Sequence, residues 1–235
     1  MQLKPLEMRQ YIWIGTLFLN MFFSSVITAQ DWSKPHISKD TQKLCRISKD
    51  KHVKTYLYNE EIRVSDYSFF LYMVGKEHGE KSDKYKALIP DTSFFFSNYR
   101  FKFTYMEKSP DYMVQLQSSL PMIGLSYEQA LAYCRWKEKM HKPSRKYVFV
   151  YSLPTKNDYE TAMGRAKITQ RKALSALQQT KRSHAIYGLT DNVAEYLADR
   201  NLVVAGGRRS TLQFEEITAV TEPIGFRLKV ERRRK

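Results

Sequence analysis

The feature that most constrains the fold of this chain is a capped helix start, with a strand a few residues after the helix ends. In "LPMIGLSYEQALAYCRWKEKM", Ser126 and Gln129 have the S-x-x-Q spacing of a capping box, and an apolar side follows them. We therefore predict a helix from Tyr127 to Met140. The next segment, "YVFVYSLPT", is rich in aromatic and β-branched residues and predicts a strand. These two elements are the clearest in the chain.

Weaker patterns predict further short elements. They are a strand in 53–64, a helix capped by Ser65 and stopped by Gly75, a second capping box at Thr155 and Asp158, a basic helix over 168–182, and short strands in 201–209 and 222–232. Residues 76–119 follow no lasting period. Their aromatic residues argue against disorder, because disordered segments lack such apolar groups.

The amino terminus has the pattern of a secretory signal peptide. Lys4 and Arg9 precede an apolar run of 17 residues, and Thr28 and Ala29 end it as a small-residue cleavage site. We predict a signal peptide over 1–29. The alternative is an uncleaved membrane anchor, although the run is shorter than the roughly 20 residues that span a bilayer. Both interpretations predict an exported protein of the periplasm or cell envelope.

The rest of the chain predicts one domain. Residues 30–52 are polar and read as a linker or lead-in, 53–230 as the domain, and 231–235 as a basic tail. There are two cysteines, Cys45 and Cys134. An exported compartment permits a disulfide between them, but the sequence does not give their distance.

The charge predicts an anionic partner. The chain has 39 Lys and Arg against 24 acidic residues, a net charge of +15. An acidic protein or an anionic envelope component fits this charge, and membrane association is open through the amino terminus or a partner. Export argues against nucleic acid. The basic clusters are Lys137–Lys146, Arg165–Arg182, Arg208 with Arg209, and the terminal "ERRRK". The alternative is that they are solvated faces and a tail.

Three carboxylates recur every four residues in "IYGLTDNVAEYLAD". On a helix, Asp191, Glu195 and Asp199 would share one face. They are either a metal or acid/base site, or a polar turn that closes the fold. The five histidines show no H-x-H or H-E-x-x-H spacing, so a zinc or iron site is not predicted.

Four segments in order resemble the formylglycine-generating-enzyme family, also called the sulfatase-modifying-factor domain. "LPMIGLSYEQALAYCRW" resembles the family's "P-V-x-G-V-S-W-x-x-A-x-x-Y-C-x-W", and "SLPTKNDYETAMGRA" resembles "R-L-P-T-E-A-E-W-E-x-A". "YGLTDNVAEY" is similar to "G-L-x-D-M-x-G-N-V-W-E-W", and "AGGR" with "IGFRL" to the closing "R-G-G-S" and "G-F-R". Upstream, "EEIRVSDYSFFL" resembles "E-V-T-N-x-x-Y-x-x-F". "LIPDT" resembles the gliding-motility and type IX secretion branch of the Bacteroidetes.

The resemblance implies a fold and a set of structural positions. The family fold is α+β and C-type-lectin-like, with small twisted sheets, few helices and much irregular chain. The structural positions of the motifs are Cys134, Trp136, Pro154, Asn192, Glu195, Gly206, Gly207, Gly225, Phe226 and Arg227.

The resemblance also implies a copper chemistry that this sequence does not support. Catalytic members oxidise a substrate cysteine with copper held by two cysteines after the "G-G-S" turn, because thiolate suits Cu(I). The corresponding segment, 206–227, has no cysteine, and Cys134 falls at a structural helix position. We therefore expect no copper, and the chain is not expected to be an oxidase of this type.

Calcium is the one cofactor that the resemblance of this turn to the family still allows. By resemblance, Asp191 and Val193 would supply carbonyls and Glu195 a carboxylate, an oxygen set suited to a hard cation. Only these three ligands can be named, against the six to eight that Ca²⁺ takes. The alternative is that Asn192 and Glu195 bond to nearby backbone and tie the turn to the core.

Three functions remain open from the sequence. The leading hypothesis is an exported, non-catalytic binding or assembly module of the cell envelope, linked to gliding or type IX secretion. The second is an enzyme of this family whose anionic substrate is bound by Arg208, Arg209 and Arg227. The third is a carbohydrate-binding module that stacks sugars on the aromatic residues of 94–105.

Overall fold

The computed structural model describes residues 44–48, 50, 52–91, 120–164, 167–169, 185–190, 192–206, 211–220 and 223–235, of which 167–169 and 185 by backbone only. They belong to one unit of the chain, residues 36–235. The helices are α3 (Val64–His78), α4 (Asp83–Lys86), α7 (Tyr127–Met140), α8 (Lys156–Met163) and the 3₁₀ turn η1 (Ile217–Ala219). The strands are β1 (Leu44–Arg46), β2 (Val53–Tyr58), β3 (Tyr147–Ser152), β4 (Lys167–Thr169), β5 (Ala185–Tyr187), β6 (Ala194–Tyr196), β7 (Leu202–Val204), β8 (Phe214–Glu216), β9 (Ile224–Gly225) and β10 (Lys229–Arg234).

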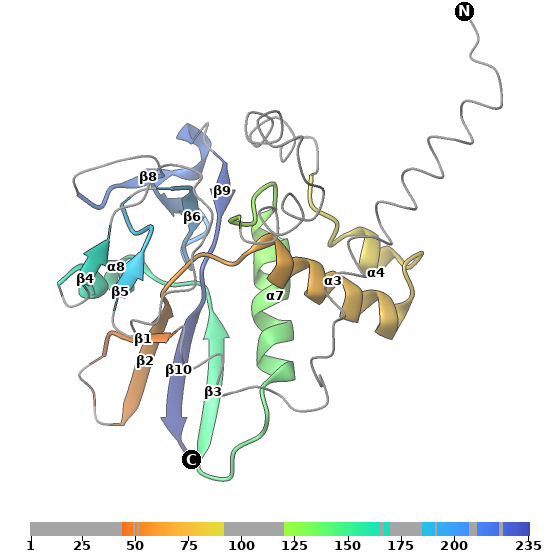
Figure 1. Cartoon of the computed structure of the whole chain (residues 1–235), viewed down its shortest axis with the longest axis horizontal. Helices are drawn as coiled ribbons and strands as arrows, with labels where there is room; N and C mark the ends of the chain where they lie inside the picture. Colours follow the sequence, from red (N-terminus) through yellow and green to blue (C-terminus); the bar gives the residue numbers. More distant parts are fainter. Residues whose placement is uncertain are drawn as a thin grey trace, which may run out of the picture. The chain divides into compact units, whose positions relative to one another are not determined.

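The strands form small open sheets (Figure 1). The larger antiparallel sheet has the order β1-β2-β10-β3, so the last strand of the chain lies at its centre and β3 at its edge. The second four-stranded sheet has the order β8-β7-β6-β9, with β6 and β9 parallel, and β4 pairs with β5. Helices and small separate sheets confirm the predicted α+β class.

Both predicted capping boxes are formed. The Ser126 hydroxyl accepts a hydrogen bond from the Gln129 amide at 3.2 Å, and the Gln129 side chain accepts one from the Ser126 amide at 2.8 Å. α7 then spans Tyr127–Met140, as predicted. Thr155 and Asp158 make the same pair of bonds at the start of α8. A local side-chain pattern therefore set both helix starts correctly.

The main core lies where α3 and α7 meet beside the larger sheet (Figure 1). Tyr133 of α7 is at its centre, with ring centroids 5.9 Å from Tyr67, 5.5 Å from Phe70 and 5.5 Å from Phe226. The buried Tyr67 hydroxyl donates to the Leu88 carbonyl at 2.9 Å. Edge-to-face and stacked rings at these distances each stabilise a core beyond their buried area.

α3 is longer than the sequence indicated. It starts at Val64, because the carboxylate of Asp66 accepts from the amide of Arg63 at 3.4 Å and the predicted cap, Ser65, is already inside the helix. The predicted stop, Gly75, also lies inside it. The helix ends instead at Gly79, whose φ is 84°, a value that favours glycine.

Three segments differ from their predicted structure. β1 lies within the predicted lead-in and pairs with β2. Residues 168 and 169, the start of the predicted basic helix, lie in β4, which pairs with β5 in parallel; residues 170–182 lie outside the described part. Residues 231–234, predicted as a tail, are the end of β10: 231–233 pair with β2 and 231–234 with β3. Strand pairing across long sequence separations outweighed local composition in each case.

The two cysteines occupy different hydrophobic clusters. The Cys134 thiol packs with α3 and α7, whereas the Cys45 thiol packs near α8 and β5, and they do not form a disulfide. Burial raises the pKa of Cys134 to about 12. Of the helices in the described part, none is long and apolar enough to cross a membrane; the predicted signal peptide lies outside that part.

Candidate functional site

A fully buried ion pair joins the 188–196 turn to the end of the chain. The guanidinium of Arg227 donates from Nε to Glu195 Oε2 at 2.6 Å and from Nη2 to Glu195 Oε1 at 2.5 Å. Neither side chain is more than 1% exposed. In addition, Nη1 donates to the Tyr58 carbonyl at 3.3 Å, and Nη2 donates to the Tyr187 carbonyl at 3.0 Å. Arg227 thus connects β2, β5 and β6 through one side chain.

Tyr159 of α8 also binds the Glu195 carboxylate. Its hydroxyl donates to Glu195 Oε2, and its ring centroid lies 5.8 Å from the Arg227 guanidinium. Burial, followed by the charge of Glu195, raises the pKa of the Tyr159 hydroxyl well above its usual value. The family pattern has Trp at this position, so the tyrosine adds a hydrogen bond to the same buried pair. Both oxygens of Glu195 therefore have partners.

A second carboxylate, Glu61, lies beside this pair. Its Oε1 accepts a hydrogen bond from Asn192 Nδ2 at 2.8 Å and lies 4.0 Å from Arg227 Nη2. Its Oε2 and the Oδ1 of Asn192 are buried and have no hydrogen-bond partner among the described residues. Burial raises the pKa of Glu61 from 4.5 to about 7, against the lowering effect of Arg227, while Glu195 raises it further. Ionised Glu61 is thus incompletely compensated.

Two motif glycines allow this packing. Gly188 has a φ of 72°, and a Cβ there would lie 3.0 Å from Glu61 Cδ and closer still to one of its oxygens. A Cβ at Gly225, in the "IGFR" segment, would lie 3.0 Å from the Met122 carbonyl oxygen. Each glycine therefore stands where the backbone approaches a neighbour closely.

The other predicted structural positions also pack in the core where they are described. The Trp136 ring lies 5.2 Å from Phe70, the Pro154 carbonyl accepts from the Ala198 amide at 2.8 Å, and Phe226 is fully buried. Gly206 is buried at the end of β7. Gly207, Arg208, Arg209, Asp191 and the aromatic residues of 94–105 lie outside the described residues.

The two described carboxylates of the turn, Glu195 and Asp199, do not share a helix face. Glu195 lies in β6 and is buried, Asp199 is exposed and accepts from the Asn201 amide at 3.0 Å, and Asp191 lies outside the described part. Among the described residues, no three His, Cys, Asp or Glu side chains cluster as metal ligands would. Both carboxylate oxygens of Glu195 are bonded to Arg227 or Tyr159, so a calcium ion on this carboxylate would compete with those bonds. Calcium ligation by Asp191, Val193 and Glu195 stays a prediction.

The geometry instead supports the structural interpretation of this turn. Glu195 and Asn192 do tie it to the core, but their partners are the distant side chains of Arg227, Tyr159 and Glu61 rather than nearby backbone. The sequence showed each residue but not the pairing, because 131 positions separate Asn192 from Glu61. Arg227 is fully buried and paired, so it cannot receive an external anionic substrate.

The pKa of Glu61 predicts how stability depends on pH. Between pH 4.5 and about 7 the carboxyl is protonated in the folded protein and ionised in the unfolded chain. The unfolded chain then binds fewer protons, so the free energy of unfolding falls as pH rises through this window. At about 1.4 kcal/mol for each pKa unit, the loss is on the order of 3 kcal/mol.

Glu61→Gln should remove this dependence while keeping an acceptor for Asn192. We expect the wild-type protein to lose stability relative to the variant as pH rises from below 4.5 to above 7. Urea denaturation at a series of pH values measures both curves. Parallel curves would show that Glu61 does not titrate in this window.

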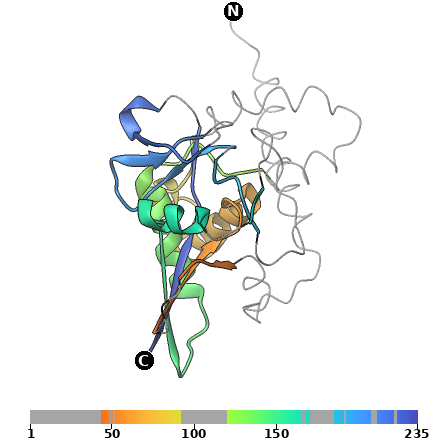
Figure 2. The same cartoon turned by 90° about the vertical axis from the view of Figure 1, so that its left-hand side faces the viewer.

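The structure brings two basic clusters together at the end of the larger sheet. Arg234 pairs with Tyr147, and the Lys235 amide donates to the Lys146 carbonyl at 3.1 Å. We call this surface the basic sheet end and define it by its exposed cations, Lys142, Arg145, Lys146, Arg233, Arg234 and Lys235. Figure 2 shows the ends of β3 and β10 projecting beyond the described helices. Both basic clusters are visible in the sequence, but only the register of β3 and β10 shows that they are neighbours.

A comparison with family models identifies the family of this chain. Residues 51–209 match the model of the sulfatase-modifying factor enzyme 1-like domain, which is more than half of the chain. Searches of curated proteins and of solved structures gave no match. The match includes Glu61, Asn192 and Glu195. Arg227 follows the matched residues, pairs with Glu195 and lies 4.0 Å from Glu61. The chain therefore belongs to the family of sulfatase-modifying factor enzyme 1-like domains.

Proposed function

We propose that this chain is a non-catalytic binding or assembly module that holds an anionic partner at the basic sheet end. The observation that supports this most strongly is that two basic clusters, far apart in the sequence, lie together at one projecting end of the larger sheet. The β10 carboxylate Glu231 is already bonded to Lys229 and Arg233. Most of the positive charge there is therefore available to a partner.

The cysteines support the non-catalytic half of the proposal. The oxidase chemistry of the family needs two thiolates on one copper ion. The chain has two cysteines, and they are buried in different hydrophobic clusters. The high pKa of Cys134 also disfavours the thiolate that copper would need. The family scaffold is thus kept without its reactive pair.

We place the module in the cell envelope, outside the cytoplasm. The apolar run before Ala29 supports export, and the "LIPDT" segment supports the gliding-motility and type IX secretion branch. We also infer the C-type-lectin-like form of the family fold, which the small sheets and long connections support. The partner is then an acidic protein or anionic component of the envelope, not nucleic acid.

A charge-matched pair of variants tests the binding surface. Arg145→Gln/Lys146→Gln/Arg234→Gln removes three charges from the basic sheet end, and Lys81→Gln/Lys84→Gln/Lys86→Gln removes three from the α4 region. We expect the full chain and the α4 variant to capture the same envelope component at low salt and to release it at raised salt. The sheet-end variant should lose most of this capture. Quantitative pull-down from envelope extracts measures all three.

Two outcomes would contradict the proposal. Equal loss in both variants would show that binding follows net charge and not this surface. Formation of an aldehyde on a cysteine peptide by the copper-treated full chain would show that the protein is catalytic.

A further inference from the structure

Among the described residues, β3 pairs with a strand on one side only. The Tyr151 amide donates to Glu138 Oε2 of α7 at 3.0 Å, so it points away from β10. Backbone groups alternate in direction along an antiparallel strand, so the amides and carbonyls of Tyr147 and Phe149 point the same way. The Lys146 carbonyl, of opposite parity, accepts from Lys235 on the β10 side. Tyr147 and Phe149 therefore present four outward backbone groups.

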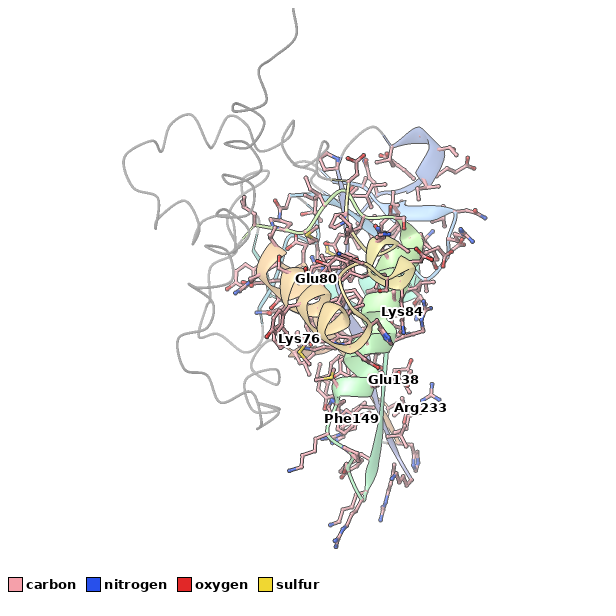
Figure 3. The ribbon with its side chains drawn as sticks, turned by 90° about the vertical axis from the view of Figure 1, so that its right-hand side faces the viewer. Lys76, Glu80, Lys84, Glu138, Phe149 and Arg233 are labelled. Atoms are coloured by element: carbon pink, nitrogen blue, oxygen red, sulfur yellow. The ribbon has the colours of Figure 1, made fainter. Side chains whose placement is uncertain are left out.

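These outward groups are unpaired within the described structure. No hydrogen bond joins the backbone of Tyr147 or Phe149 to described residues on that side. Glu138 of α7 occupies the backbone edge at Tyr151, and the ring of His141, which follows α7, stacks on the Phe149 side chain with ring centroids 4.0 Å apart. Figure 3 shows Phe149 and Arg233 beyond the end of the helix that carries Glu138. Val148, between the two, is 43% exposed. The open edge is thus short and partly apolar.

Positive charge surrounds this open edge. Arg145 and Lys146 immediately precede β3, and Arg234 pairs with its first residue. The guanidinium of Arg232 lies 4.7 Å from the centre of the Tyr147 ring, and its buried Nε has no hydrogen-bond partner within the described part of the chain. A second copy of this chain would bring the same cations to the edge, and like charges oppose that pairing.

We propose that the open edge of β3 binds an extended acidic segment of a partner protein as an added strand. The backbone of that segment pairs with Tyr147 and Phe149, its apolar side chains contact Val148, and its carboxylates meet Arg145, Lys146 and Arg234. About four residues can pair, since Glu138 closes the edge at Tyr151. The inference rests on the proposed function and adds how the partner is recognised.

A labelled peptide in which Glu alternates with Val is the probe, and fluorescence anisotropy with the full chain is the measurement. The matched peptide carries N-methyl groups on alternate amides, which keep its charge but block backbone pairing on one edge. We expect it to bind at least tenfold more weakly than the unmodified peptide. Peptide binding should also slow hydrogen exchange at the amides of Tyr147 and Phe149.

Two variants at one position separate the backbone from the side chain. Tyr147→Pro and Tyr147→Ala both remove the ring, but only proline removes the outward amide, and proline is tolerated at the first residue of an edge strand. We expect Tyr147→Pro to bind the peptide about three- to tenfold more weakly than Tyr147→Ala, the effect of one backbone hydrogen bond. Circular dichroism checks that both variants fold.

The outcomes separate this inference from the proposed function. Equal binding of the two peptides, with loss in the Arg145→Gln/Lys146→Gln/Arg234→Gln variant, would overturn strand addition and leave the basic binding surface intact. Failure of the unmodified peptide to bind at low salt would also overturn strand addition. Tight binding to vesicles of anionic phospholipid, unchanged in Tyr147→Pro, would assign the surface to lipid instead.

Discussion

Replacing Arg227 with methionine is expected to lower the free energy of unfolding by about 3 to 5 kcal/mol. The change leaves the Glu195 carboxylate, which is 1% exposed, without a counter-charge. It also removes the donors to the carbonyls of Tyr58 and Tyr187. Breaking one side of a buried pair costs more than the pair contributes, because the remaining charge stays out of water. Urea denaturation of the two proteins measures the difference.

A second substitution tests this explanation. Adding Glu195→Gln to Arg227→Met removes the uncompensated charge while keeping an acceptor for the Tyr159 hydroxyl. The double variant should therefore be more stable than Arg227→Met alone. As a surface control, Arg200→Met breaks an exposed pair with Glu128 at 3.0 Å and should cost no more than about 1 kcal/mol. If the losses of unfolding free energy caused by Arg227→Met and Glu195→Gln simply add in the double variant, then Arg227 and Glu195 act independently.

How far the sequence predicts this fold depends on the distance over which each interaction acts. The helix starts at Tyr127 and Lys156 follow from capping boxes whose partners are three residues apart, and both were predicted correctly. α3 was misjudged by the same logic, since Asp66 bonds with Arg63 rather than supporting a start at Ser65. Local patterns therefore locate helices well, and their ends less well.

The order of the strands, unlike the helix starts, depends on residues that are far apart in the sequence. Residues 231–234 are basic enough to resemble a solvated tail, yet they pair with β2 and β3 at the centre of the larger sheet. Nothing in "ERRRK" indicates this, because pairing depends on partners that are far away in the sequence. The same long-range register places Lys146 beside Lys235. The binding surface proposed above was therefore predictable only as two unconnected clusters.

The candidate site shows the same division. The family motifs identified Asn192, Glu195 and Arg227 as structural positions, and all three lie in the buried network. Glu61 was missed, although it lies in the upstream segment that resembles the family's "E-V-T-N" strand. Its signal was a carboxylate at the end of an apolar strand, where a charge needs a partner. Its partners, however, come from distant segments of the chain.

Gly188→Ala is expected to destabilise the protein by about 2 to 5 kcal/mol. A positive φ costs a residue with a Cβ about 1 to 2 kcal/mol, and Gly188 has a φ of 72°. The new Cβ would also overlap the Glu61 carboxyl group, whose Cδ is 3.0 Å away, and overpacking of this kind costs about 1 to 3 kcal/mol. The carboxylate cannot move aside easily, because its Oε1 is held by Asn192.

A double-mutant cycle with Glu61→Ala separates the two costs. In that background the overlap is gone, so Gly188→Ala should cost only the backbone part, about 1 to 2 kcal/mol. Urea denaturation of each variant gives the coupling energy. An equal cost of Gly188→Ala with and without Glu61 would show that the close approach carries no energy and that backbone conformation alone requires glycine there.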